Sequence, residues 1–297
     1  MKKLLILLIA IVLIISCKSN KQPETDTKPI VTASILPQKY FIDRIVNGKI
    51  DVNVMVPEGS DPHIYEPSAK QMKDLSNSNA YFKMGHIEFE LAWMSKFAAL
   101  NPSMKIVNLS KNALLIEPEN LHDDHDHEDH GHHHGVDPHI WSSPLEVKKI
   151  CKLLVENLVV LYPDYKDEFE TNYKTLISEI DSLDLSIKEK LKTIEGKKFM
   201  IYHSALAYFA RDYNLEQISI ETDGKEPSPI EIKNIIELAQ KENIRVIFVQ
   251  KQFNTNSAEV LAREINGHVV QIDPLGYDWM QTTKLISNEI ALIYSVE

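Results

Sequence analysis

The sequence has few cysteines, and this scarcity excludes a fold held together by disulfide bonds. Only Cys17 and Cys151 occur in the 297 residues. Cys17 follows an export-like segment and is expected to carry a lipid, so Cys151 has no intramolecular partner. The fold must therefore depend on burial of apolar side chains. The 43% of hydrophobic residues is enough for one large core or two smaller ones.

Positive charge is scarce relative to negative charge. The chain has 32 Lys and Arg against 43 Asp and Glu, a formal net charge of −11. This balance argues against nucleic acid as a partner and suits a cationic one. Common enzyme motifs are also absent: there is no His-Glu-x-x-His motif, no phosphate-binding glycine loop and no Gly-x-Ser-x-Gly elbow. We therefore do not expect an enzyme.

The N-terminal apolar run is too short for a permanent membrane span. It covers residues 4–15, about 12 residues, whereas a transmembrane helix needs roughly 20. Two lysines precede the run, and a small residue and Cys17 follow it, which is typical of a bacterial lipoprotein signal peptide. We expect residues 1–16 to be the signal peptide and residues 17–29 a polar tether. The lipid on Cys17 would hold an extracytoplasmic protein at the membrane, in the periplasm or on the cell surface.

From residue 30 the chain alternates β-rich runs with amphipathic segments. Such alternation predicts the α/β class, with mainly parallel sheets covered by helices. Strands are expected at 30–36, 52–56, 80–84 and 106–109, and again at 199–202, 217–221, 246–250 and 269–272. Helices are expected at 145–161, 229–242, 257–266 and 281–294. Two lobes result, residues 30–162 and residues 196–297.

The stretch between these lobes has the most regular helical pattern. From Tyr165 to Ile194, nine apolar positions recur about every 3.6 residues, which is the α-helical period. One helix of this length measures about 45 Å and can join two lobes. We therefore expect residues 163–195 to be a linking helix. A helical hairpin or coiled-coil arm is the alternative, because residues 181–186 weaken the pattern.

A short histidine motif occurs twice and is the most informative feature that is present. Asp-Pro-His-Ile followed by an aromatic residue stands at 61–65 and at 137–141. Each copy places a histidine, His63 or His139, on a proline-stiffened turn beside an aromatic ring. Metal ligands are commonly held in this way, although two ordinary surface turns are the alternative.

Two further candidate ligands, His203 and Asp273, each directly follow an expected strand. Ligand-binding groups collect at the carboxyl ends of strands in open α/β sheets. If the lobes face each other across a cleft, His63 and His139 come from one wall and His203 and Asp273 from the other. Three imidazoles and one carboxylate suit four-coordinate Zn²⁺, although affinity alone would also admit copper or nickel. Four protein ligands leave little room for an activated water, so the set indicates metal capture and not catalysis.

Three other polar residues have weaker claims to a role in the site. We expect His86 and His268 to lie in turns and not to bind metal. Glu66 follows His63 by three positions and is expected to orient its imidazole through the second ring nitrogen.

An acidic, histidine-rich run occupies residues 122–134 and holds seven of the twelve histidines. It has no apolar residue, so it is expected to be a mobile loop. Its composition favours weak, multiple binding of Zn²⁺, which could raise the local metal concentration, sense metal or load the main site. A solvated linker is the alternative. The seven histidines are His122, His125, His127, His130, His132, His133 and His134.

These features together resemble the zinc and manganese solute-binding lipoproteins of ABC importers, which include zinc-uptake binding proteins and streptococcal adhesin lipoproteins. The resemblance covers nearly the whole chain after residue 30. It depends on the two histidine motifs, the histidine after 199–202, Glu-Pro-Ser-Pro at 226–229, Gln-Phe at 252–253 and Asp-Pro-Leu-Gly at 273–276. It implies two α/β lobes bridged by one long helix, with the metal in the cleft between the lobes.

The resemblance also implies a function and partners. The implied Zn²⁺ ligands are His63, His139, His203 and Asp273. Manganese and iron members tend to have a glutamate in place of His203, so zinc is favoured. The chain would be a monomer that captures Zn²⁺ and delivers it to an ABC permease with a separate ATPase. The alternatives are a manganese or iron carrier, a secreted zinc hydrolase with Asp273 as its base, and an adhesin or metal store that uses the histidine-rich run.

The chain departs from the family pattern at two places. Gln250 and Lys251 stand where the family often has Glu-Pro, and Cys151 lacks the partner with which some zinc members form a disulfide in the second lobe.

Overall fold

The computed structural model describes residues 28–117, 135–221 and 225–294. The expected signal peptide, Cys17 and the histidine-rich run 122–134 lie outside the described residues. Within the described ranges, no helix has both the length and the apolar character needed to span a membrane.

The first lobe is built on a four-stranded parallel sheet in the order β2-β1-β3-β4. Its strands are β1 (Ile30–Ala33), β2 (Asp51–Val54), β3 (Ala80–Lys83) and β4 (Lys105–Asn108). Its helices are α2 (Leu36–Val46), α3 (Ala69–Leu75) and α4 (Glu88–Leu100). The apolar strands β1 and β3 lie at the centre of the sheet, as expected for a sheet with helices on both faces.

The second lobe repeats this plan with the strand order β6-β5-β7-β8, again all parallel. Its strands are β5 (Lys198–Ile201), β6 (Glu216–Ser219), β7 (Val246–Gln250) and β8 (His268–Ile272). Its helices are α7 (Ala207–Asp212), α8 (Pro229–Lys241) and α9 (Asn256–Glu264). The predicted α/β class with two mainly parallel sheets is therefore confirmed.

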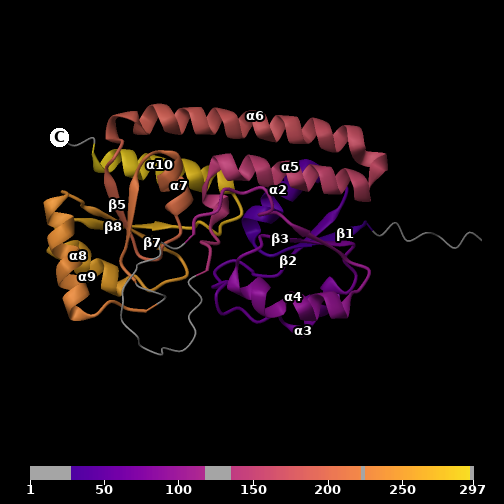
Figure 1. The fold of residues 1–297 in the computed structure, drawn as a ribbon, viewed down its shortest axis with the longest axis horizontal. Helices are drawn as coiled ribbons and strands as arrows, with labels where there is room; N and C mark the ends of the chain where they lie inside the picture. The colour runs from indigo at the N-terminus through magenta and orange to yellow at the C-terminus, as the bar shows by residue number, and fades with distance from the viewer. Residues whose placement is uncertain (1–27, 118–134, 222–224, 295–297) are drawn as a thin grey trace, which may run out of the picture.

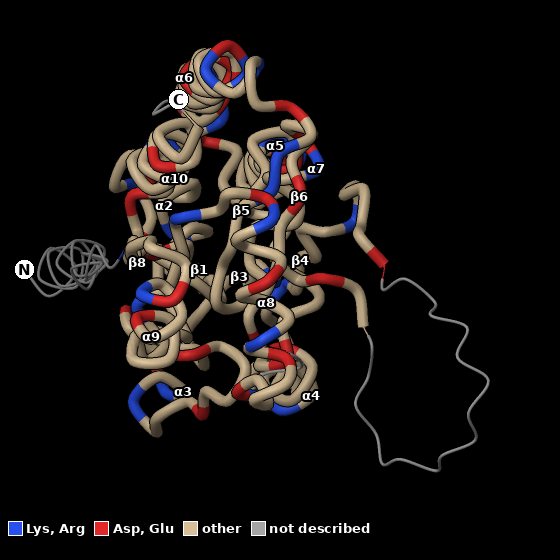
Figure 2. The backbone as a smooth tube through the Cα atoms, turned by 90° about the vertical axis from the view of Figure 1, so that its left-hand side faces the viewer, with Lys and Arg blue, Asp and Glu red and all other residues tan. Residues whose placement is uncertain are grey.

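The two lobes lie side by side, and α6 (Lys166–Leu191) runs along both of them (Figure 1). It packs against α5 (Pro144–Leu161), against α2 and against α10 (Trp279–Ile293). These helices and α7 form a layer on one side of the sheets, while α3, α4, α8 and α9 lie on the other side (Figure 2). Acidic and basic residues are interspersed on α6 in the same view.

The predicted linking helix is continuous from Lys166 to Leu191, with a short 3-10 turn at each end, so the hairpin alternative is wrong. The weak middle of its apolar pattern contains a buried carboxylate, Asp184. One of its oxygens accepts a hydrogen bond from the hydroxyl of Tyr213 at 3.0 Å, and the other pairs with Lys188 at 2.8 Å. The buried charge is thus partnered within the fold.

The first strand is shorter than the expected 30–36 and ends at Ala33. Pro37 is the second residue of α2, in the first turn, where its missing amide proton costs no helical hydrogen bond. The side chain of Gln38 folds back and accepts hydrogen bonds from the amides of Ser34 and Ile35 at 2.9 and 3.0 Å. The chain is thereby turned from the strand into the helix within two residues.

One hydrophobic core extends through both lobes. It runs from the first sheet through α5, α6 and α10 to Phe199 and Phe248 of the second sheet. Phe41 of α2 contacts Trp279 of α10 edge to face, with ring centres 5.3 Å apart. A smaller cluster lies in the second lobe around Ile247, beneath α8 and α9. The lobes are therefore joined by packed side chains as well as by the linking helix.

Candidate metal centre

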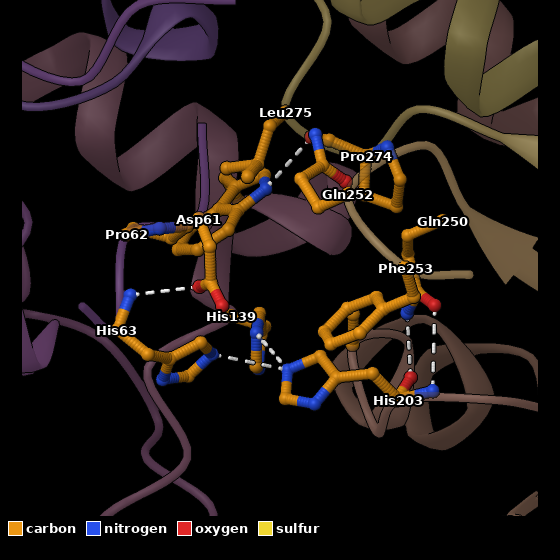
Figure 3. A pocket seen from close by; sticks show the side chains of 12 residues that line it. Asp61, Pro62, His63, His139, His203, Gln250, Gln252, Phe253, Pro274 and Leu275 are labelled. Atoms are coloured by element: carbon orange, nitrogen blue, oxygen red, sulfur yellow. Dashed lines mark hydrogen bonds between the residues drawn. The ribbon is translucent and has the colours of Figure 1, made fainter. Parts of the chain in front are cut away.

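Three imidazoles converge between the two sheets (Figure 3). His63 lies in the loop between β2 and α3, His139 directly precedes the 3-10 turn Ile140–Ser142, and His203 follows β5. The Nε2 atom of His203 is 3.3 Å from Nε2 of His63 and 3.3 Å from Nε2 of His139. Within the described residues, these three form a group whose ligand atoms all lie within 4.8 Å of one another.

The repeated motif has the same local structure in both copies. In the first copy the carboxylate of Asp61 accepts a hydrogen bond from the amide of His63 at 2.9 Å. In the second, the carboxylate of Asp137 accepts one from the amide of His139 at 2.8 Å. Asp commonly forms such a turn with the backbone two residues on, and proline stiffens it. The motif therefore fixes the backbone from which each imidazole projects.

Each imidazole also has a carboxylate on its second ring nitrogen. The Nδ1 atoms of His63, His139 and His203 lie 2.9 Å from Glu88, 2.9 Å from Asp137 and 2.5 Å from Glu221. A proton held at Nδ1 by the carboxylate leaves the lone pair on Nε2, which is the tautomer that binds metal. All three imidazoles thus direct an acceptor nitrogen at one point.

The expectation for Glu66 is wrong, because its side chain is exposed and Glu88 occupies the position beside His63. Sequence reasoning also missed Glu221. Neither Glu88 nor Glu221 stands at a sequence spacing from its histidine that would identify it. Each carboxylate meets its imidazole only after the lobe has folded.

The separations of two of these nitrogens from Nε2 of His203 fit a tetrahedral ion. With metal–nitrogen bonds of 2.0–2.1 Å, as for Zn²⁺, a tetrahedral arrangement places ligand nitrogens about 3.3 Å apart. The two separations from His203 are both 3.3 Å. Acceptor nitrogens this close to one another repel, so a cation among them would relieve the repulsion. The donor set therefore fits Zn²⁺.

Burial and the neighbouring carboxylates shift the pKa values of two of the imidazoles in opposite directions. Burial lowers the pKa of His203, and the hydrogen bond that its Nδ1 donates to Glu221 offsets this only in part. For His63, burial also lowers the pKa, but the hydrogen bond to Glu88 and the charges of Glu88, Asp61 and Glu221 together outweigh it, so its pKa is raised overall. The lowered pKa of His203 favours the neutral form that a metal ligand requires.

Side chains of the second lobe position His203. The buried side-chain amide of Gln250 makes two hydrogen bonds to the backbone of His203. Its Nε2 donates to the carbonyl of His203 at 2.6 Å, and its Oε1 accepts from the backbone amide of His203 at 3.3 Å. The ring of Phe253 stacks on the imidazole with centres 5.2 Å apart. With Trp141, Pro274 and Leu275, Phe253 gives the pocket apolar walls.

Asp273 lies where the sequence places it, directly after β8, but it does not join the group of three imidazoles. One carboxylate oxygen is 3.2 Å from the ammonium of Lys251, and the other accepts a hydrogen bond from Gln252 at 3.4 Å. His86 and His268 also lie outside the group; His86 lies in a bend, but the expectation of a turn is wrong for His268, which begins β8.

His139 was expected on the first-lobe wall of the cleft, but the segment that carries it also contacts the second lobe. The indole of Trp141 donates to the carbonyl of Pro274 at 3.0 Å, and the indole of Trp279 donates to the carbonyl of Trp141 at 2.7 Å. The hydroxyl of Tyr208 donates to the carbonyl of Asp137 at 2.7 Å. The segment that carries His139 is therefore hydrogen-bonded to the second lobe and lies where the two lobes meet.

Fold and site together define a two-lobed α/β binding protein with a candidate metal centre between the lobes. The family model described as "Zinc-uptake complex component A periplasmic" matches residues 31–289, and the chain belongs to this family. The family resemblance seen in the sequence is thus confirmed.

Known relatives agree with this membership. The chain is 28% identical over 265 residues to the high-affinity zinc uptake system protein ZnuA of Bacillus subtilis, covering 88% of this chain and 82% of that one. It is 28% identical over 299 residues to the zinc-binding lipoprotein AdcA of Streptococcus pneumoniae strain R6, covering 99% of this chain but 59% of the relative. The chain therefore spans about three fifths of that relative's length.

A solved structure has the same fold. The crystal structure of a ZnuA protein is 36% identical in sequence and superposes with a TM-score of 0.82, covering 90% of this chain and 99% of that chain.

Proposed function

We propose that this chain is the zinc-binding component of an ABC importer, which captures Zn²⁺ outside the cytoplasm and delivers it to a membrane permease driven by a separate ATPase. His63, His139 and His203 bind the ion through Nε2, and Asp273 supplies the fourth ligand. The observation that carries the proposal is the convergence of three imidazoles, with Nε2 of His203 3.3 Å from that of each of the other two and a carboxylate on every Nδ1. The family and the relatives' names support zinc as the cargo.

The ligand set favours zinc over the other cargoes considered. Manganese and magnesium sites lean toward carboxylates and water, whereas three imidazoles and one carboxylate suit Zn²⁺. The remaining parts of the proposal come from the sequence and the family. Cys17 carries the lipid anchor, the protein is a monomer in the periplasm or on the cell surface, and the histidine-rich run 122–134 binds zinc weakly and loads the main site.

Titration of metal-free protein with zinc tests this proposal. We expect one tight site, and His203→Ala should weaken it by more than about 100-fold, because even residues behind the ligands are worth 10–100-fold in affinity. His268→Ala is the matched control, since His268 lies in the same lobe but outside the group of three. Its affinity should equal that of the wild type.

Deletion of residues 122–134 separates the main site from the histidine-rich run. The deletion should leave the tight site nearly intact and remove only weak sites. The opposite ordering, in which the deletion abolishes tight binding and His203→Ala does not, would show that the run is the principal site and the protein a metal store. Elemental analysis of protein purified without added metal separates a zinc carrier from a manganese or iron carrier.

One observation favours a second candidate, a zinc hydrolase. Three imidazoles with a fourth position left open are also a ligand set of catalytic zinc. The zinc-loaded protein should then turn over an ester or a peptide, and His203→Ala should abolish that turnover. We expect no turnover, because Asp273 occupies the fourth position once zinc is bound.

A further inference from the structure

Lys251 lies between two carboxylates that come from different lobes. It directly follows β7, and its ammonium is 3.2 Å from Oδ2 of Asp273 in the second lobe. The same ammonium is 3.9 Å from Oε1 of Glu58, which lies in the loop after β2 in the first lobe. Its side chain is 48% exposed, whereas that of Asp273 is 11% exposed. The more buried carboxylate thus has the nearer contact.

Both oxygens of Asp273 are engaged, because Gln252 donates to Oδ1 at 3.4 Å while Lys251 pairs with Oδ2. The three imidazoles, by contrast, are already assembled without this carboxylate. A divalent ion that binds Asp273 through Oδ2 therefore competes with Lys251 for that oxygen. It must also do so against the repulsion between the ammonium and the incoming ion.

We propose that Lys251 is a built-in competitor for Asp273. The ion first binds the three imidazoles and then displaces the ammonium from Asp273, while Lys251 keeps its contact with Glu58 across the lobes. This proposal rests on the proposed function and concerns how that site sets its affinity. Lys251 is a positioning residue, because it acts through Asp273 and does not touch the ion.

Removal of the competitor should tighten metal binding. Lys251→Met keeps the unbranched stem of the side chain, one atom shorter, but leaves Asp273 without its competing cation. We expect zinc affinity to rise by about two- to fivefold, the range that corresponds to a partly exposed ion pair. Lys251→Arg retains the positive charge and should bind zinc as the wild type does.

A double-mutant cycle shows whether the effect passes through Asp273. We expect Asp273→Asn to weaken zinc binding, and in that background Lys251→Met should bring no further gain. Lys198→Met is the control for net charge, because Lys198 stands at the opposite end of the second sheet and pairs with Glu216 at 2.8 Å. The Lys198→Met variant should bind zinc with unchanged affinity.

The cycle is measured by competition between each variant and a chelator for zinc, and it distinguishes two failures. If the wild type lacks a tight site, or His203→Ala leaves it intact, the proposed function fails. If those results are as expected but Lys251→Met does not tighten binding, the competitor proposal alone fails. An equal gain in the wild-type and Asp273→Asn backgrounds would also overturn it, as would an Asp273→Asn variant that binds zinc normally.

Discussion

At the residue scale, the three carboxylates behind the imidazoles differ in their exposure to water. The side chain of Glu221 is 6% exposed and that of Glu88 is 52% exposed. A buried charge–imidazole contact is screened less by solvent than an exposed one. Glu221 should therefore contribute more than Glu88 to the orientation and basicity of its imidazole.

Glu221→Gln tests this difference. The amide can still accept a hydrogen bond from Nδ1 of His203, but it carries no charge, so Nε2 becomes a weaker ligand. Zinc affinity should fall by about 10- to 100-fold. Glu88→Gln is the matched variant at His63, and the fall in zinc affinity that it causes should be several times smaller. Chelator competition measures both, and equal losses would show that exposure does not rank these contacts.

Residues of the site were predictable where the local sequence carries the information. His63 and His139 follow from a repeated turn motif, and His203 follows from its position at a strand end. Glu88 and Glu221 were not predictable, because they lie 25 and 18 positions from their histidines and meet them only in the folded lobe. Glu66 was chosen for its nearness in sequence, yet its side chain turns to solvent.

At the element scale, the linking helix shows what periodicity can and cannot predict. The apolar positions of α6 predicted one continuous helix, and the buried face includes Phe169, Leu176 and Ile180. The sequence indicated an interruption of the apolar pattern near Asp184, but it did not indicate which residues pair with this carboxylate. Its partner Tyr213 lies 29 residues away, on the chain just after α7, a helix that the sequence patterns had not predicted.

Two leucines on α6 provide a matched test of how this helix is held. Leu176 is fully buried, whereas Leu185 is 66% exposed. Leu176→Ala should lower the free energy of unfolding by about 2–5 kcal/mol, because it leaves a cavity beneath the helix. Leu185→Ala should change it by less than about 0.5 kcal/mol. Urea unfolding followed by circular dichroism measures both, and a similar small loss from each would mean that α6 is not packed on the lobes as described.

At the scale of the whole molecule, the lobes are coupled by more than the linking helix. The shared core continues through α10, and Tyr40 of α2 contacts Tyr277 edge to face at 5.6 Å between ring centres. The hydroxyl of Tyr277 also donates to Asp43 of α2 at 2.8 Å. Such contacts limit how far the lobes can separate. The close approach of His63 to His203 is consistent with a centre assembled before the ion arrives.

Zinc should therefore stabilise both lobes together, because the proposed ligands come from the first lobe, from the segment of His139 that contacts both lobes, and from the second lobe. An ion that binds only the folded protein adds about 4 kcal/mol to the free energy of unfolding at a free concentration 1,000 times its dissociation constant. Thermal unfolding of wild-type protein with zinc should thus shift upward as one transition, and a chelator should reverse the shift. His203→Ala should remove the shift, while His268→Ala, outside the centre, should keep it. A zinc-dependent shift confined to one of two separate transitions would mean that the ion is held within a single lobe, because only ligands shared between the lobes couple their unfolding.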